Sequence, residues 1–126
     1  MDPTKGRALV IDDETMVRST LTDVLEACGY AADAAESGEA ALARFAAGRY
    51  RVVLTDLLMP GMSGLEVVAG VRRVDPGVPV ILLTGLGNTS ATAAARGDGV
   101  LVLSKPPSLA KLRAALETAC GQPTGT

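Results

Sequence analysis

The feature that most constrains this chain is a set of short apolar runs that each end at a polar or charged residue. The clearest run covers residues 52–56, ends at Asp56 and is followed by Met59-Pro60-Gly61. A short apolar run before turn residues is typical of a strand buried on both faces of a parallel sheet. Ligands bind at the carboxyl ends of such strands, so Asp56 stands where chemistry is expected. The alternative is that Asp56 only caps or starts the turn.

Four further apolar runs alternate with segments of helical spacing. The predicted strands cover residues 8–11, 30–35, 52–56, 79–83 and 100–103. The predicted helices cover residues 15–28, 39–47, 64–75, 88–96 and 109–119. This alternation predicts an α/β fold with a single doubly wound five-stranded parallel sheet and helices on both faces. The strand at 30–35 has a weak pattern interrupted by Asp33, which indicates an edge position.

The helical segments carry end signals and apolar stripes. Gly29 is placed to end the first helix, Ser63 and Glu66 match a capping box, and Ser108 is placed to cap the last helix. The residues expected to face the sheet are Val17, Leu21, Val24, Leu25, Cys28, Leu42, Phe45, Ala46, Leu65, Val68, Val71, Leu109, Leu112, Leu116 and Ala119. The segment 88–96 offers only alanines for burial, so we expect it to dock weakly.

Length and composition exclude several classes of function. With 126 residues, we expect one domain (1–126) with a core over about residues 7–119 and a loose tail over 121–126. A net charge of −2 without a basic run gives no case for direct nucleic-acid binding, and no apolar run is long enough to span a membrane. Two distant cysteines and no signal-peptide core indicate a cytoplasmic protein. The absence of histidine excludes histidine-based catalysis.

Charged and hydroxyl side chains collect at the predicted strand ends. They are Asp12, Asp13 and Glu14 after the first strand, Asp56 after the third, Thr84 after the fourth and Lys105 after the fifth. Three adjacent acids usually form a solvated turn, but here they follow a buried strand directly. Crowded carboxylates repel unless a cation is present, and an oxygen-only set of ligands suits Mg²⁺. Lys105 and Thr84 suit phosphoryl oxygens, and Asp56 can act as the oxygen nucleophile that forms an aspartyl phosphate.

Across residues 7–119 the chain resembles the receiver domain of two-component response regulators. The resemblance implies a flavodoxin-like strand order 2-1-3-4-5, with Asp56 in Asp-Leu-Leu-Met-Pro-Gly as the phosphoacceptor. It also implies that Asp12, Asp13, Asp56 and the backbone carbonyl of Leu58 bind Mg²⁺. In the same way, Thr84 stands for the switch hydroxyl and Lys105 for the lysine of the Lys-Pro pair. The implied partners are a histidine kinase or phosphotransfer domain, and a downstream output domain or protein.

One position departs from the family pattern. Receivers usually carry Tyr or Phe three residues before the lysine, and this chain has Val102. Receivers fused to histidine kinases tolerate an aliphatic residue there, so a piece of a hybrid sensor kinase is a second interpretation. A valine has no ring to swing inward, which leads to the hypothesis that the readout passes through residues 85–99.

Two other functions compete with the phosphorylation-dependent switch. One is a receiver-like interaction module that never turns over phosphate. The complete set of acids, threonine and lysine argues against this function. The other is a Mg²⁺-dependent phosphohydrolase with Asp56 as nucleophile. Such an enzyme needs a second carboxylate soon after the nucleophile, and residues 57–64 contain none. If the chain is an enzyme at all, it catalyses only its own phosphorylation and slow dephosphorylation.

Overall fold

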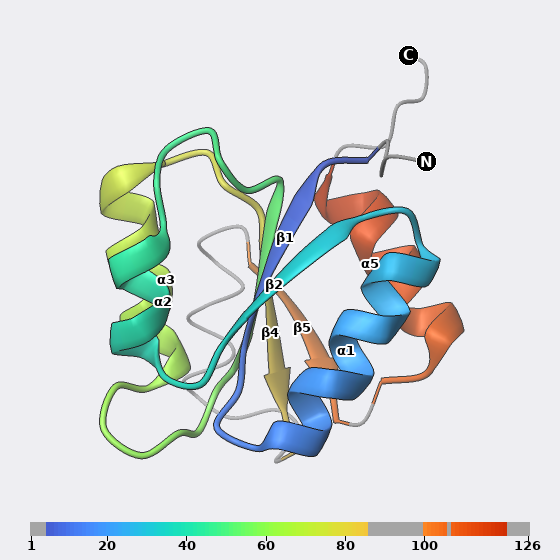
Figure 1. Cartoon of the computed structure of the whole chain (residues 1–126), viewed down its shortest axis with the longest axis horizontal. Helices are drawn as coiled ribbons and strands as arrows, with labels where there is room; N and C mark the ends of the chain where they lie inside the picture. The colour runs from blue at the N-terminus through green and yellow to red at the C-terminus, as the bar shows by residue number, and fades with distance from the viewer. Residues whose placement is uncertain (1–4, 86–99, 106, 121–126) are drawn as a thin grey trace.

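The computed structural model describes residues 5–85, 100–105 and 107–120 and contains one parallel sheet (Figure 1). The strands are β1 (Arg7–Ile11), β2 (Ala31–Ala35), β3 (Val52–Asp56), β4 (Val80–Thr84) and β5 (Val100–Ser104). Their order in the sheet is β2-β1-β3-β4-β5 and every neighbouring pair is parallel. The predicted doubly wound sheet, its order and the edge position of β2 are confirmed.

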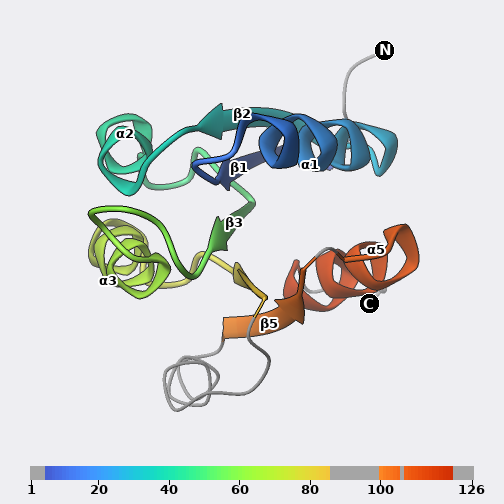
Figure 2. The same ribbon diagram turned by 90° about the horizontal axis from the view of Figure 1, so that it is seen from below.

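Helices cover both faces of this sheet. They are α1 (Thr15–Ala27), α2 (Gly38–Arg44), α3 (Gly64–Val74) and α5 (Leu109–Ala119). Figure 2 shows α2 and α3 on one side of the strands, and α1 and α5 on the other. Some predictions fall on residues outside the described ranges. They are the helix at 88–96, the tail at 121–126, the residue Pro106 and, apart from Gly85, the segment 85–99 of the readout hypothesis. None of the helices in the described ranges is long and apolar enough to cross a bilayer.

Two apolar clusters hold the helices to the sheet. Because side chains alternate between the faces of a strand, Val53 packs toward α2 and α3 while Leu54 packs toward α1 and α5. Both side chains are fully buried, as are their neighbours on β1 and β4. A central strand that is apolar on both faces therefore anchors the two layers at once.

The helix end signals are confirmed in detail. Gly29 has a φ of +99°, a left-handed conformation that a residue with a side chain rarely adopts. The Ser63 hydroxyl accepts a hydrogen bond from the Glu66 amide at 3.3 Å, and the Glu66 carboxylate accepts one from the Ser63 amide at 2.8 Å. The Ser108 hydroxyl caps α5 by accepting a bond from the Lys111 amide at 3.1 Å.

Two details of the burial prediction are wrong. The helix α2 ends at Arg44, because Phe45 is already extended; Phe45 itself is buried, but Ala46 is exposed. Leu109, at the first position of α5, is 49% exposed because α5 reaches the apolar cluster only from Leu112 onward. In both cases the helical spacing of apolar residues in the sequence includes a residue that does not lie against the sheet.

Candidate functional site

Three carboxylates meet at the carboxyl end of the sheet. Asp12 follows β1, Asp13 follows Asp12, and Asp56 ends β3, which is the direct neighbour of β1. One oxygen atom from each carboxylate can be chosen so that all three lie within 4.8 Å of one another. Asp12 is fully buried, Asp56 is 7% exposed and Asp13 is exposed, so the cluster forms a pocket open to solvent on one side. We call these three residues the acidic pocket.

Lys105 places one positive charge in the acidic pocket. Its Nζ atom donates to Asp56 Oδ2 at 3.1 Å and to Asp12 Oδ2 at 3.3 Å. The Lys105 amide donates to the Thr84 carbonyl at 2.9 Å, which fixes the start of the loop after β5 against the end of β4. The lysine side chain is 20% exposed. The residues after β1, β3 and β5 thus converge as the sequence predicts.

Asp12 is held through both its side chain and its backbone. Its Oδ1 accepts a hydrogen bond from the Glu14 amide at 2.9 Å, and its carbonyl accepts one from Arg18 Nη1 at 2.8 Å. Arg18 Nη2 also donates to Thr15 Oγ1 at 3.2 Å. The sequence did not indicate that Arg18 contacts Asp12. The signal that could have found it is an arginine one turn into the helix that follows the acids.

The backbone around Asp56 is fixed by the neighbouring strand and by α3. The Leu57 amide donates to the Leu83 carbonyl at 2.8 Å, and the Gly64 amide donates to the Leu57 carbonyl at 2.8 Å. A Cβ atom at Gly64 would collide with the Asp56 carbonyl oxygen and lie 2.8 Å from the Leu57 Cα. The start of α3 therefore touches the main chain of Asp56, and only glycine fits at that contact.

The electrostatics of the acidic pocket disfavour a fully ionised state without a cation. Burial raises the pKa of the Asp56 carboxyl, and the charges of Asp12 and Asp13 raise it further. The hydrogen bond from Lys105 lowers that pKa but does not outweigh the other effects. Burial by itself would lower the pKa of the Lys105 ammonium, but its hydrogen bond and charge interaction with Asp56, and those with Asp12, outweigh burial and raise it. Lys105 is therefore charged. Any further positive charge nearby would favour the ionised form of the Asp56 carboxyl.

The remaining predicted site residues have different surroundings. Thr84 ends β4 next to β3 and is 1% exposed. Leu58 lies in the loop after β3 with its side chain 59% exposed, and its carbonyl stays a predicted metal ligand. Val102 lies in β5, half-buried against the cluster on the side of α2 and α3.

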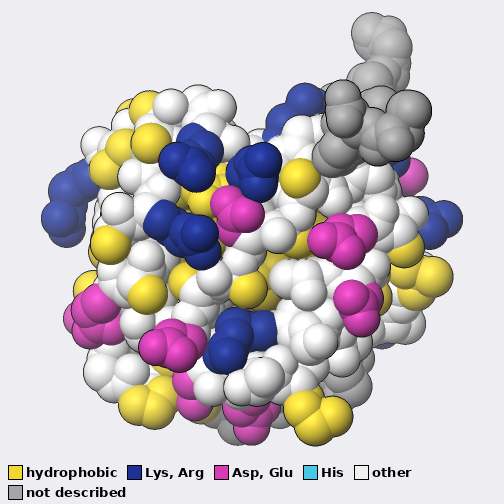
Figure 3. Space-filling view, in the orientation of Figure 1, with side chains coloured by type: hydrophobic (Ala, Val, Ile, Leu, Met, Phe, Trp, Pro, Cys, Tyr) yellow, Lys and Arg dark blue, Asp and Glu magenta, His cyan; other side chains and the backbone are white. Residues whose placement is uncertain are grey.

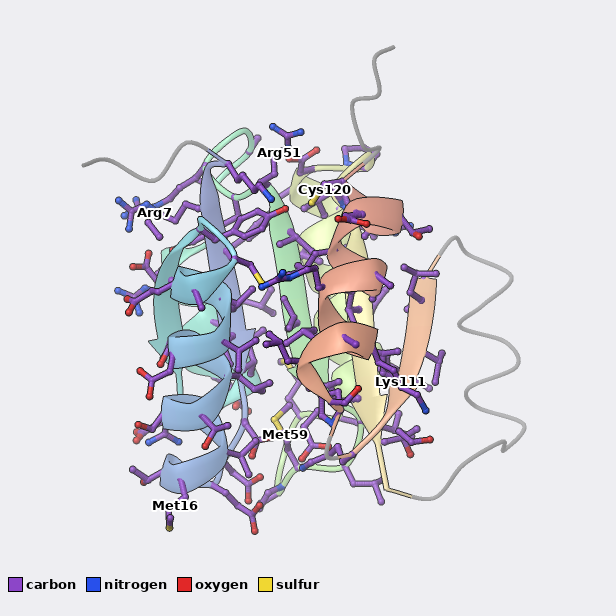
Figure 4. The ribbon with its side chains drawn as sticks, turned by 90° about the vertical axis from the view of Figure 1, so that its right-hand side faces the viewer. Arg7, Met16, Arg51, Met59, Lys111 and Cys120 are labelled. Carbon is purple, nitrogen blue, oxygen red and sulfur yellow. The ribbon has the colours of Figure 1, made fainter. Side chains whose placement is uncertain are left out.

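The cysteines lie far from this pocket. In Figure 4, Met16 and Met59 mark the end of the molecule that carries the acids, and Cys120 lies at the opposite end. The Tyr30 hydroxyl donates to Cys120 Sγ at 3.1 Å. Burial is the main reason that the pKa of Tyr30 is raised. Both Cys28 and Cys120 are free thiols, as expected for a chain without a disulfide framework.

The donor set of the acidic pocket fits a hard divalent cation. It offers carboxylate oxygens only, from two neighbouring strand ends, and one of the three acids faces solvent. Mg²⁺ prefers oxygen ligands and keeps several of its waters, so one or two carboxylates are enough to hold it. A second cation would also relieve the repulsion that Lys105 alone leaves in place.

Comparisons with known proteins identify the family of this chain. The family model for the response regulator receiver domain matches residues 8–117. The chain is 36% identical over 107 residues to a response regulator receiver protein of Anaeromyxobacter sp., covering 84% of this chain and 45% of that protein. It is 41% identical over 88 residues to the transcriptional regulatory protein ResD of Bacillus subtilis, covering 69% of this chain and 36% of ResD.

Solved structures give the same picture. A response regulator receiver domain protein from Clostridium thermocellum superposes with a TM-score of 0.85 at 30% identity, covering 92% of this chain and 94% of that one. The chemotaxis protein CheY4 of Vibrio cholerae superposes with a TM-score of 0.80 at 27% identity, covering 90% and 98%. The chain spans less than half the length of the two curated relatives named above. It belongs to the receiver domain family of two-component response regulators.

Proposed function

We propose that this chain is a phosphorylation-dependent switch whose phosphoacceptor is Asp56. The observation that carries the proposal is the position of this carboxylate. It is almost buried, lies within hydrogen-bond distance of Lys105, and shares its pocket with Asp12 and Asp13. A carboxylate oxygen is a weak nucleophile, and it needs positive charge nearby to receive an anionic phosphoryl group.

The proposed step moves a phosphoryl group from a phosphohistidine to Asp56. An Asp56 carboxylate oxygen forms a bond to phosphorus while the phosphorus–nitrogen bond of the donor breaks. The nitrogen keeps the electron pair of that bond and takes a proton from solvent, and the product on this chain is an acyl phosphate. Little covalent chemistry is needed from the protein, so positioning and charge account for the catalysis.

Each residue of the pocket has a proposed part in this step. Asp12, Asp13 and Asp56 would hold Mg²⁺ together with the Leu58 carbonyl, and the ion would neutralise charge on the phosphoryl oxygens. Lys105 would exchange its contact with the Asp56 carboxylate for a phosphoryl oxygen. The Thr84 hydroxyl would donate to another phosphoryl oxygen and so pass the change to β4. The proposal also treats residues 1–126 as a single domain.

The proposed partners follow from this chemistry. The donor is a histidine kinase or a phosphotransfer domain that presents a phosphohistidine, and a cytoplasmic location is proposed with it. The relative ResD, which is named a transcriptional regulatory protein, is longer than this chain, so an output domain or a separate downstream protein is the proposed receiver of the signal. Direct contact of this domain with nucleic acid or membrane is not part of the proposal.

Incubation with Mg²⁺ and acetyl phosphate tests the phosphoacceptor. We expect one phosphoryl group per chain by intact-mass analysis, removable by hydroxylamine as an acyl phosphate should be. Asp56→Asn should abolish the adduct, and Asp23→Asn, which changes an exposed acid on α1, should leave it intact. A persistent adduct in Asp56→Asn would disprove the assignment. No adduct in the parent chain would favour the phosphate-independent module, and rapid multiple turnover would favour the phosphohydrolase.

A further inference from the structure

A second hollow opens between α1 and α2, at the carboxyl end of the edge strand β2. Its volume is about 450 Å³, and it does not include any residue of the acidic pocket. Figure 3 views the molecule from the side of β2 and shows Lys and Arg side chains on the hollowed face between the helices. Small side chains leave the space open, and the hollow is lined by Arg18, Ala34, Ala35, Glu36, Ala40, Ala43 and Arg44. We call it the arginine groove.

Two guanidinium groups reach the arginine groove from different helices. Arg18 belongs to α1, and its Nη1 donates to the Asp12 carbonyl at 2.8 Å. Arg44 ends α2, and its Nη1 donates to the Ala34 carbonyl at 2.8 Å. Each group has five N–H donors, so these bonds leave several donors free in both. The backbone bonds also restrict both side chains before any ligand arrives, which lowers the entropic cost of binding.

Within the described part of the chain, no carboxylate forms an ion pair with either of these two arginines. Among the described residues, the ion pairs join Arg7 to Asp33 and Lys105 to Asp12 and Asp56. Arg18 and Arg44 bond to neutral carbonyl and hydroxyl oxygens instead. Glu36 also lines the groove but is exposed, so the groove carries one net positive charge.

We propose that the arginine groove binds small molecules that carry a phosphate group. Guanidinium groups match phosphate oxygens in pairs, and a dianionic phosphate can use two of them at once. Apart from these charges the lining consists mainly of alanines, so little affinity can come from burying a large apolar group. The ligand is therefore recognised by its anionic oxygens. This site goes beyond the proposed switch and does not require phosphorylation of Asp56.

The first experiment uses the Asp56→Asn chain, labelled with ¹⁵N and freed of divalent metal with a chelator. This variant cannot accept a phosphoryl group at Asp56, so failure of the proposed switch would not affect the result. Titration with inorganic phosphate and with pyrophosphate should produce saturable amide shifts over residues 15–18 and 34–44. Shifts that do not saturate, or that centre on the amides of Ser104 and Lys105 beside the acidic pocket, would overturn the proposal.

Charge variants then test whether the two arginines recognise the probe. Arg44→Gln should weaken pyrophosphate binding at least about tenfold, the usual size of one charged hydrogen bond, and Arg44→Lys should restore part of the affinity. Arg113→Gln removes the same charge from an exposed position on α5 and should leave binding unchanged. Equal weakening in Arg113→Gln would show unspecific attraction and overturn the proposal.

A variant that gains affinity makes the test independent of any folding defect in Arg44→Gln. Glu36 is exposed and lines the groove, so its carboxylate opposes an anionic ligand. Glu36→Gln should therefore tighten pyrophosphate binding several-fold while the amide spectrum stays that of a folded chain. Unchanged or weaker binding in Glu36→Gln would contradict the proposed site.

Discussion

The strand β3 changes character between its middle and its end. Leu54 is a fully buried apolar side chain, and its removal from water stabilises the fold. Two positions later Asp56 is nearly as buried, but its carboxylate lies beside two other acids and only one lysine. One strand therefore carries a stabilising segment and, at its end, the proposed phosphoacceptor, whose charge opposes stability. The interior of the sheet must therefore supply the stability that the pocket at its end gives up.

Removal of a buried apolar side chain from the middle of β3 should change stability the most. Leu54→Ala should lower the free energy of unfolding by about 2–5 kcal/mol, because the site lies between two strands and cannot collapse easily. Urea denaturation followed by circular dichroism measures the change. The matched control is Leu109→Ala, at a leucine that is 49% exposed, which should stay within about 0.5 kcal/mol of the parent chain. Equal losses in the two variants would contradict the burial pattern.

Replacement of Lys105 removes its ammonium group from the acidic pocket. Lys105→Ala should lower the free energy of unfolding by roughly 1–2 kcal/mol, because Asp12 and Asp56 lose a charged hydrogen bond while solvent still reaches the site. The variant should still fold and accept a phosphoryl group from acetyl phosphate. It should not show the phosphorylation-dependent chemical shifts of the parent chain. Parent-like shifts on phosphorylation would contradict the role proposed for Lys105.

Ionisation of Asp56 should lower the free energy of unfolding. Its pKa is raised in the folded chain, so the folded state is disfavoured once the carboxyl ionises. Without divalent metal at neutral pH, Asp56→Asn should raise the free energy of unfolding, by less than Leu54→Ala lowers it. The gain should be fully present above the raised pKa and disappear as pH falls below 3.8, the ordinary value. A gain that persists unchanged at lower pH would have another origin.

The smallest expected effect is that of the metal. Mg²⁺ at a concentration equal to its Kd should raise the free energy of unfolding by about 0.4 kcal/mol, through binding to the folded state alone. Asp13→Ala should lose this increase, whereas Asp23→Asn, at an exposed acid of α1, should keep it. Calorimetric titration gives the affinity directly. Parent-like Mg²⁺ affinity in Asp13→Ala would remove Asp13 from the set of ligands.

Much of the fold and the pocket was predictable because both depend on strand ends. Apolar runs of strand length locate β1, β3, β4 and β5, and parallel connection brings their carboxyl ends to one edge. Asp12, Asp56 and Lys105 therefore meet, although the lysine is 49 positions from Asp56 in the chain. The sequence also carries the local end signals, such as the capping box at Ser63 and the left-handed Gly29.

The features that were missed depend on tertiary packing. Helical spacing does not reveal where a helix leaves the sheet, so Ala46 and Leu109 were expected inside and are exposed. Val67 was not expected in the core and is fully buried, since α3 turns it toward the cluster that holds α2 and α3 to the sheet. The bond from Arg18 to the Asp12 carbonyl joins a side chain to a backbone group, which residue patterns do not encode.

The close contact of Gly64 with Asp56 has a consequence for how this sequence can change over evolution. Substitutions at most surface helix positions are nearly neutral, so such positions drift freely. At position 64 even the smallest side chain would push against the Asp56 carbonyl and the Leu57 backbone. Lineages that need the pocket intact can therefore explore many alternatives along the rest of α3 but only one residue at its first position. In a saturation library selected for signalling, codon 64 should tolerate as little variation as codon 56.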